Sequence, residues 1–290
     1  MRLGYSITSF HGSDPSVGAD RVLDRASAAA TAGFDYVEAG DHHAVAGGNY
    51  LQNVPMAARL TESFDYVAPM FLLPLYHPVL VAEQVGTIAA LADRVDVWCA
   101  VGRAGPAYDA FGISPAERGG RMEEALTVLD RLWAHDGVSF DGEFYQLEDV
   151  SINPKADPRI CIGGSAEPAV RRAGRQGDAW VANADVPFEG VTRRLPWFEE
   201  AGGGDVLLRR DVIALADGDR ARRRRDALLE AGYRGWPADA GWTLAGDSDD
   251  IAADLERFRD AGIDEVIVRP MDGKHATETL ETVVAARDRL

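Results

Sequence analysis

The sequence has 290 residues, 46% of them hydrophobic and 27% charged, and its formal net charge is −17. This length allows one α/β barrel with a full core, and the negative charge excludes a surface built to neutralise a nucleic-acid backbone. Lys155 and Lys274 are the only lysines among 30 basic residues, and so many carboxylates beside arginines indicate adaptation to high salt, where screening is strong. A genome rich in GC also favours arginine and stays open as an alternative.

The chain carries no feature of a secreted or membrane protein. Its start, MRLGYSITSF, lacks a cationic region followed by a long apolar one, and the longest apolar run, 67–75, is far shorter than the ~20 residues of a membrane span. Cys99 and Cys161 lie in apolar runs without the spacing of a zinc site or a redox pair. We therefore expect a cytoplasmic protein without a metal site, with one domain over residues 1–290.

Strands and helices alternate along the first half of the chain. Short apolar runs predict strands buried on both faces of a parallel sheet, and apolar residues at helical spacing predict helices. The expected strands are 3–8, 35–39, 66–73 and 95–101, and the expected helices are 18–31, 54–62, 79–91 and 115–133.

The second half continues this alternation after one interruption. The segment VSFDGEFYQLEDVSI alternates apolar and polar residues around Asp141-Gly142, which predicts a β-hairpin. Eight strands, each followed by a helix, predict a (β/α)8 TIM barrel with this short hairpin inserted after the fourth βα unit. An open doubly wound sheet is the rival, but SITSFHGS after the first strand lacks its glycine-rich fingerprint. The later expected strands are 160–162, 179–182, 206–214 and 265–268, and the later helices are 168–176, 220–230, 251–260 and 276–290.

Asp41, His42 and His43 follow the second expected strand. Active sites of TIM barrels lie at the C-terminal ends of the strands, and a histidine there can exchange a proton near neutral pH. Adjacent residues of an extended segment point to opposite sides, so we expect one histidine to face the site; a zinc ion would need further ligands. The alternative is that one histidine caps a helix and the other packs in the core.

Glycine-containing turns follow the fourth and fifth expected strands. The turn 102–105 carries Arg103, whose planar fork suits a phosphate, and the turn 163–166 leads into a helix whose first amides favour an anion. Arg121 lies in the helix between them, within reach of the same anion. Because these two strands are neighbours in a barrel, we expect one phosphate site. A plain strand-to-helix turn is the alternative.

Pro69 lies inside the apolar third strand, where it removes a ladder hydrogen bond and predicts a bulge. A distorted strand there could support a flat ring, and a simple bulge is the alternative.

Together these segments resemble the luciferase-like superfamily of flavin- and deazaflavin-dependent oxidoreductases. The resemblance covers most of the chain to about Trp180, and a weaker match follows at LAGDSDDIAADLERFRDAGIDEVIVRP. It rests on GDHHAVAGGNYLQNVPMAARL, FLLPLYHPVLVAEQVGTIAALADR, ERGGRMEEALTVLDRLW and FDGEFYQLEDVSINPKADPRICIGGSAEPAVRRAGRQGDAW.

The resemblance implies roles for matching residues. His42 is implied as the site histidine near the reactive edge of the cofactor ring, and Arg103 and Arg121 as the residues that meet its phosphate. The third strand of such proteins often carries a non-prolyl cis peptide behind the ring. The implied cofactor-binding residues are Pro69, Met70, Phe71, Gly102, Arg103, Arg121, Gly163, Gly164 and Ser165.

The resemblance leaves two cofactors open, FMN and coenzyme F420. With reduced FMN and oxygen the chain would be a monooxygenase acting on a small organic substrate, and the Asp-His-His triplet favours this interpretation. With F420 it would be a hydride-transfer oxidoreductase, which a haloarchaeal source would favour. A non-catalytic flavin-binding protein and a metal-dependent barrel hydrolase are the remaining alternatives.

The implied partners are the small-molecule substrate, the flavin or deazaflavin, and a separate reductase as one source of reduced cofactor. Gly86, Ala89 and Ala90 give the helix 79–91 a small-residue face, which favours a homodimer. No nucleic-acid or membrane partner is expected.

Overall fold

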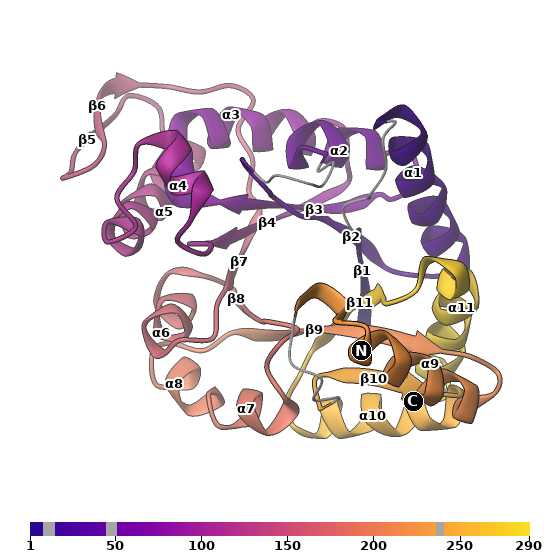
Figure 1. The fold of residues 1–290 in the computed structure, drawn as a ribbon. Helices are drawn as coiled ribbons and strands as arrows, with labels where there is room; N and C mark the ends of the chain where they lie inside the picture. Colours follow the sequence, from indigo (N-terminus) through magenta and orange to yellow (C-terminus); the bar gives the residue numbers. More distant parts are fainter. Residues whose placement is uncertain (8–14, 45–50, 236–240) are drawn as a thin grey trace.

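Eight parallel strands close into a barrel with helices around its outside in a computed structural model that describes residues 1–7, 15–44, 51–235 and 241–290 (Figure 1). The ring closes because β9 pairs with both β8 and β11, and β11 pairs with β1. The predicted TIM barrel is thereby confirmed; Thr8, the expected end of the first strand, lies outside the described residues. Around the barrel the strands are β1 (Arg2–Ser6), β2 (Tyr36–Ala39), β3 (Tyr66–Leu72), β4 (Arg94–Ala100), β7 (Arg159–Gly163), β8 (Ala179–Ala182), β9 (Asp205–Ala214) and β11 (Glu265–Pro270).

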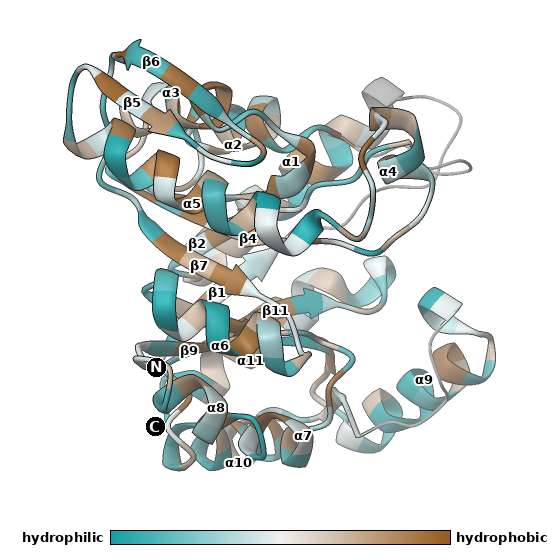
Figure 2. Cartoon of the chain, turned by 90° about the vertical axis from the view of Figure 1, so that its left-hand side faces the viewer, coloured by the Kyte–Doolittle hydropathy of each residue, from teal (hydrophilic) through white to brown (hydrophobic). Residues whose placement is uncertain are grey.

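The long helices match the expected ones to within a few residues at most ends. They are α1 (Pro15–Ala32), α2 (Asn53–Leu60), α3 (Pro78–Ala89), α5 (Arg118–Ala134), α6 (Glu167–Gln176), α9 (Gly218–Glu230), α10 (Ser248–Asp260) and α11 (Ala276–Arg287). In Figure 2 the chain termini lie at one end of the barrel, and α9 lies at the other, where the strands finish.

The hairpin after α5 is confirmed as β5 (Val138–Asp141) paired with β6 (Gln146–Val150). Its turn is held to α5 by Glu124, whose carboxylate accepts hydrogen bonds from the backbone N–H groups of Glu143, Phe144 and Tyr145 at 2.7, 2.9 and 3.2 Å.

Several short elements were not predicted. Helices of five or six residues complete little more than one turn and therefore carry no periodic pattern. A ninth strand, β10 (Thr243–Gly246), pairs with the C-terminal half of β9, on the edge where β8 pairs with its first half. The unpredicted elements are α4 (Pro106–Phe111), α7 (Phe188–Thr192), α8 (Leu195–Glu199), β10, and the 3-10 turns η1 (Leu73–Leu75), η2 (Tyr233–Gly235) and η3 (Gly273–His275).

Alternation along the strands fills two separate cores. Inward side chains such as Tyr36, Trp98 and Leu207 fill the barrel, and outward side chains such as Phe71 and Val97 pack against the helices.

The third strand is interrupted at Pro69 without a bulge. The pairing of β3 with β4 has no partners at Ala68 and Pro69, yet Met70 resumes opposite Trp98 in the register set by Tyr66 and Arg94. A proline without an N–H explains the gap, whereas an added residue would have shifted the register. The bulge expected here is therefore wrong, and among the described residues the cis peptide bond is Asn153–Pro154 rather than one in β3.

The N-terminal end of the barrel is closed by an ionic cluster. The Arg159 guanidinium lies 3.2 Å from Asp96 and 2.8 Å from Glu265, and it also contacts Asp205. Arg2 contacts the same Glu265. Arg94 lies 3.5 Å from Asp96, so three arginines surround the three carboxylates of the barrel floor.

Gly86, one of the three small residues of the predicted dimer face, packs within the chain. A Cβ built on Gly86 would lie 2.1 Å from the carbonyl oxygen of Pro154, so glycine is needed for this close approach. Gly86 therefore does not supply the intersubunit surface that we inferred from it, and the homodimer stays a prediction.

Cys99 and Cys161 are buried free thiols, and burial raises the pKa of each.

None of the helices in the described ranges has both the length and the apolar character of a membrane span.

Candidate active site at the C-terminal end of the barrel

The segment after β2 is anchored by Asp41. Its buried carboxylate accepts hydrogen bonds from the backbone N–H of Leu72 at 2.8 Å and from the Tyr76 hydroxyl at 3.0 Å, and it lies 2.9 Å from His43 Nε2. The His43 ring also contacts the Tyr76 hydroxyl at 2.9 Å. His43 is thus the packed member of the histidine pair, and this network ties the end of β2 to the end of β3.

His42 is the half-buried member of the pair. Its Nδ1 contacts the Asp41 carbonyl oxygen, which can only accept, so the neutral ring carries its lone pair on Nε2. Burial lowers the pKa of His42, and Arg234 and His43 lower it further, against the opposing charges of Asp41 and Glu38. His42 is therefore neutral near pH 7 and can accept a proton.

Glu38 lies next to His42 and is almost completely buried. A Cβ built on Gly40 would lie 3.6 Å from Glu38 Oε1 and 4.0 Å from His42 Cε1, which places the two side chains around one point. Glu38 Oε2 accepts from the Ser6 hydroxyl at 2.6 Å and pairs with Arg209 Nη2 at 2.7 Å. Glu38 Oε1 is buried without a hydrogen-bond partner.

The turn after β7 requires glycine at position 164. Gly164 has φ +150°, and a Cβ built on it would lie 2.6 Å from the Cβ of Ala169 in α6. Its carbonyl oxygen accepts from Trp180 Nε1 at 2.7 Å, so the turn is held from β8.

The amides of this turn remain available for an anion. Arg194 Nε donates to the Ser165 carbonyl at 2.7 Å, while the amides of Ser165 and Ala166 donate no hydrogen bond to another described residue. Ala166 is the N-cap of α6 and offers no side-chain cap, so the positive end of the helix dipole also stays uncovered. This geometry fits a phosphate.

The turn after β4 brings Arg103 across the end of β7. Arg103 Nη2 lies 3.6 Å from Asp185, which follows β8, and 82% of the Arg103 side chain is exposed. Gly102, with φ +68°, packs against Leu72. Arg103 and the 163–166 turn therefore lie on two adjacent strand ends, those of β4 and β7, as one phosphate site requires.

Arg121 is engaged elsewhere. Its Nε donates to Glu117 at 2.9 Å, and its guanidinium lies 5.0 Å from the ring centre of Phe144 in the hairpin. Arg121 also acts electrostatically on Tyr108, whose hydroxyl donates to the Val101 carbonyl before the Arg103 turn, and its role at a phosphate stays a prediction.

The three residues singled out in β3 point in different directions. Met70 packs with Trp98 inside the barrel, whereas Phe71 is fully buried in the outer core, in edge contact with Tyr76. Pro69 is buried in the strand between them. Of the three, Met70 alone has a side chain placed to meet a ligand above the barrel.

Charged residues inside the barrel strands were missed by sequence reasoning. Arg209 and Asp211 on β9, Arg269 on β11 and Glu38 on β2 lie in otherwise apolar runs. Arg269 Nη2 pairs with Asp211 at 2.6 Å. A charge at an inward position of an apolar strand is the signal that could have identified them.

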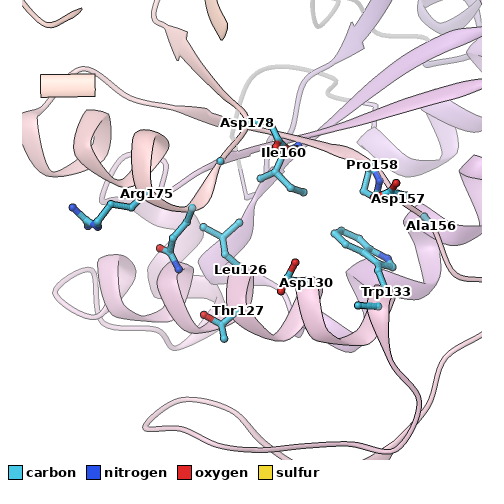
Figure 3. Close-up of a pocket in the computed structure, with 13 residues that line it drawn as sticks. Leu126, Thr127, Asp130, Trp133, Ala156, Asp157, Pro158, Ile160, Arg175 and Asp178 are labelled. Carbon is cyan, nitrogen blue, oxygen red and sulfur yellow. Dashed lines mark hydrogen bonds between the residues drawn. The ribbon is translucent and has the colours of Figure 1, made fainter. Parts of the chain in front are cut away.

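A cavity of about 650 Å³ opens at the opposite end of the barrel, between α5 and α6 (Figure 3). Its walls include Trp133, Ile160 and Asp178, at the N-terminal ends of β7 and β8. It is therefore separate from the strand ends that carry His42 and the 163–166 turn. Among the described residues, no group of three or more histidine, cysteine or acidic side chains is placed to hold a metal ion.

Known proteins share both the sequence and the fold. A family model described as luciferase-like monooxygenase matches residues 1–265. An F420-dependent hydroxymycolic acid dehydrogenase from Mycobacterium tuberculosis is 28% identical over 225 residues, which cover 71% of this chain and 61% of that protein. An F420-dependent glucose-6-phosphate dehydrogenase from Beutenbergia cavernae is 30% identical over 210 residues, which cover 67% and 60%. The chain thus spans about three fifths of the length of these two relatives.

Solved structures match over nearly the whole chain. A monooxygenase from Streptomyces bottropensis has a TM-score of 0.86 at 20% identity, covering 98% of each chain. An F420-dependent secondary alcohol dehydrogenase, solved with an F420-acetone adduct, has a TM-score of 0.78 at 19% identity, covering 99% of each chain. These likenesses are likenesses of fold.

Proposed function

Because this chain belongs to the luciferase-like monooxygenase family, we propose that it is an oxidoreductase that binds FMN or coenzyme F420 at the C-terminal end of its barrel and acts on a small organic substrate. The observation that carries the proposal is the pairing of a neutral histidine after β2 with an uncapped, glycine-dependent helix start after β7.

The phosphate of the cofactor is held at the 163–166 turn. The amides of Ser165 and Ala166 and the dipole of α6 favour an anion there, and Arg103 is exposed beside them. A phosphate that binds Arg103 would replace its long contact with Asp185 by a charge-assisted hydrogen bond.

His42 exchanges the proton of the reaction. Its ring is oriented by the Asp41 carbonyl, and Asp41 is itself fixed by Leu72 and Tyr76, so Nε2 is presented in one direction. A neutral imidazole can accept the proton of a substrate hydroxyl or, once charged, return it. A bound deazaflavin would supply hydride transfer at this place, and a bound flavin would supply oxygen chemistry.

F420 is supported by the names of two of the curated relatives, the F420-dependent dehydrogenases described above. FMN is the second candidate, supported by the Asp41-His42-His43 triplet and its resemblance to the luciferase-type members of the family.

A fluorescence titration of the full chain with each cofactor tests the proposal and separates the two candidates. Tight binding of F420 alone indicates a hydride-transfer enzyme; tight binding of FMN, with oxygen consumption on reduction, indicates a monooxygenase. Arg103→Ala should weaken binding by about 1–3 kcal/mol, the size of a charge-assisted hydrogen bond. Binding of neither cofactor contradicts the proposal.

His42→Ala separates an enzyme from a cofactor-binding protein. Cofactor affinity should stay within a few fold, whereas turnover should fall by roughly 10²–10⁴-fold if His42 exchanges the proton. Turnover can be followed by the absorbance of the cofactor on mixing with candidate alcohols and carbonyl compounds. Unchanged turnover would remove His42 from the proposed chemistry.

A further inference from the structure

Arginines gather at the mouth of the barrel, on the side away from the 163–166 turn. Arg209 projects from β9 and Arg269 from β11, and Arg234 lies in η2, near enough for its charge to act on His42. Two buried carboxylates face them: Glu38 pairs with Arg209 at 2.7 Å and Asp211 with Arg269 at 2.6 Å. In a chain with a net charge of −17, a region where arginines are as frequent as carboxylates is unusual.

Arg209 presents one edge of its guanidinium to the mouth. Its Nε and Nη2 are buried, and Nη2 lies on Glu38, while 18% of the side chain remains exposed. The exposed part of the guanidinium is therefore the Nη1 edge. The group also lies 5.6 Å from the ring centre of Trp98, so an apolar wall supports it from below.

The position of Glu38 brings Arg209 to the proposed proton-exchanging residue. Glu38 Oε1 and His42 Cε1 lie 3.6 and 4.0 Å from one point beside Gly40, and Glu38 Oε2 holds Arg209. A ligand group on Arg209 would therefore lie beside His42, over Met70 and Trp98.

The arginines of this region lie close enough to repel one another. Burial lowers the pKa of Arg234, and repulsion from Arg269 lowers it further, against the opposing effects of Asp211 and Tyr233. Arg234 also has φ +55°, a conformation that costs a non-glycine residue energy and occurs most at functional sites. An anionic ligand would offset both the crowding of like charges and the burial of the arginines.

We propose that the substrate carries an anionic oxygen group, such as a carboxylate, that binds the Nη1 edge of Arg209 beside His42. Arg234 and Arg269 strengthen this preference at longer range. Glu38 is a positioning residue, because it holds Arg209 by the nitrogen that faces away from the mouth. The proposal rests on the proposed function for its meaning in the reaction, but the binding of the anion does not depend on the cofactor.

The test compares benzoate with benzamide, its neutral isostere, by calorimetric titration of the full chain at constant ionic strength. The unsubstituted protein should bind benzoate about tenfold more tightly, the effect of one charge-assisted hydrogen bond. Arg209→Gln should remove this preference. Arg175→Gln, which removes an equal charge on α6 beside the cavity of Figure 3, should keep it.

A second variant guards against loss of folding. Arg209→Gln leaves Glu38 buried without its cation, so Glu38→Gln/Arg209→Gln, which replaces the pair by two neutral amides, should fold and also lack the preference. Equal binding of the two probes by the unsubstituted protein, no binding of benzoate, or a preference that survives in the double variant overturns the proposal. An equal loss in Arg175→Gln would also overturn it, because the effect would then belong to net charge. Failure of FMN and F420 to bind would contradict the proposed function and leave the benzoate result standing.

Discussion

The N-terminal and C-terminal ends of the barrel contain the same kinds of charged residues, but these residues have different roles. At the N-terminal end Arg159 joins three carboxylates, Asp96, Asp205 and Glu265, and Arg2 adds a second cation to Glu265. Just 12% of the Arg159 side chain is exposed, so its charge interacts mainly with carboxylates of the protein and not with a ligand or solvent.

At the C-terminal end two buried carboxylates each pair with one arginine, and a third, Asp41, contacts His43. Glu38 pairs with Arg209 and Asp211 with Arg269, and Arg234 adds a further positive charge among the described residues there. The first arrangement closes the floor of the barrel, and the second leaves the Nη1 edge of Arg209 exposed at the mouth. The difference shows that a buried ion pair by itself does not mark a site, whereas an exposed guanidinium edge does.

The largest expected effect is on the floor of the barrel. Arg159→Met would leave Asp96 and Glu265 buried without their shared cation, and should lower the free energy of unfolding by about 3–5 kcal/mol in urea denaturation. Asp205→Asn is the control, because Asp205 is 47% exposed and its loss should cost less than about 1 kcal/mol. A loss at Arg159 as small as that at Asp205 would show that the floor does not depend on charge pairing.

Arg210, on the outer side of β9, is a buried cation that can be compared with the paired arginines at the two ends of the barrel. Arg210 is 1% exposed, lies 5.7 Å from the ring centre of Phe258, and has a buried Nη2 without a hydrogen-bond partner. Burial lowers the pKa of Arg210 to about 10, against the attraction of Asp211 and Asp254. Because this pKa lies below the usual value, the folded state disfavours the charged form at neutral pH, and stability should rise as the pH approaches and passes about 10.

Arg210→Met should therefore raise the free energy of unfolding by about 1–4 kcal/mol at pH 7. Arg257→Met is the matched control, since Arg257 pairs with Glu189 at 2.6 Å on the surface and should change stability by less than about 1 kcal/mol. Destabilisation of Arg210→Met would mean that its neighbouring carboxylates compensate the buried charge fully.

The smallest expected effect is a change of titration at the mouth. Four charged or titratable neighbours act on His42: Asp41 and Glu38 raise its pKa, and Arg234 and His43 lower it. Glu38→Gln removes a negative charge with little change of shape, so the pKa of His42 should fall further. An NMR titration of the His42 Cε1–H resonance measures this, with exposed His135 as the control. A rise, or an equal shift at His135, would show that Glu38 does not act on His42.

Sequence reasoning predicted the barrel because its strands are continuous apolar runs, which parallel strands buried on both faces require. It did not predict β10, whose four residues, TLAG, are too few to carry a pattern. It predicted a bulge at Pro69. The missing N–H instead interrupts the pairing of β3 with β4 at Ala68 and Pro69 and leaves the register of the two strands unchanged.

Sequence reasoning predicted the site residues that a single residue type at a strand end identifies. It missed the residues whose role depends on a partner far away in the chain. Glycine at 164 and the histidines after β2 are readable from local sequence, because each follows a strand end. Glu38 and Arg209 are far apart in the chain, and their pairing depends on the closure of the barrel. The local sequence likewise could not show which of His42 and His43 packs in the protein, because Tyr76, which contacts His43, follows another strand.

The way β10 joins the sheet has a consequence for engineering and for the evolution of the chain. The segment 215–242 leaves the sheet after Ala214, the last residue of β9, and rejoins it at Thr243, which lies opposite Asp211 of the same strand. Strand residues advance about 3.3 Å each, so the two attachment points lie about 10 Å apart along β9, and this fixed spacing makes the segment a cassette with two defined ends. Cassettes of other lengths, exchanged between related barrels, would alter the surroundings of Arg234 while β9 keeps Arg209 in place.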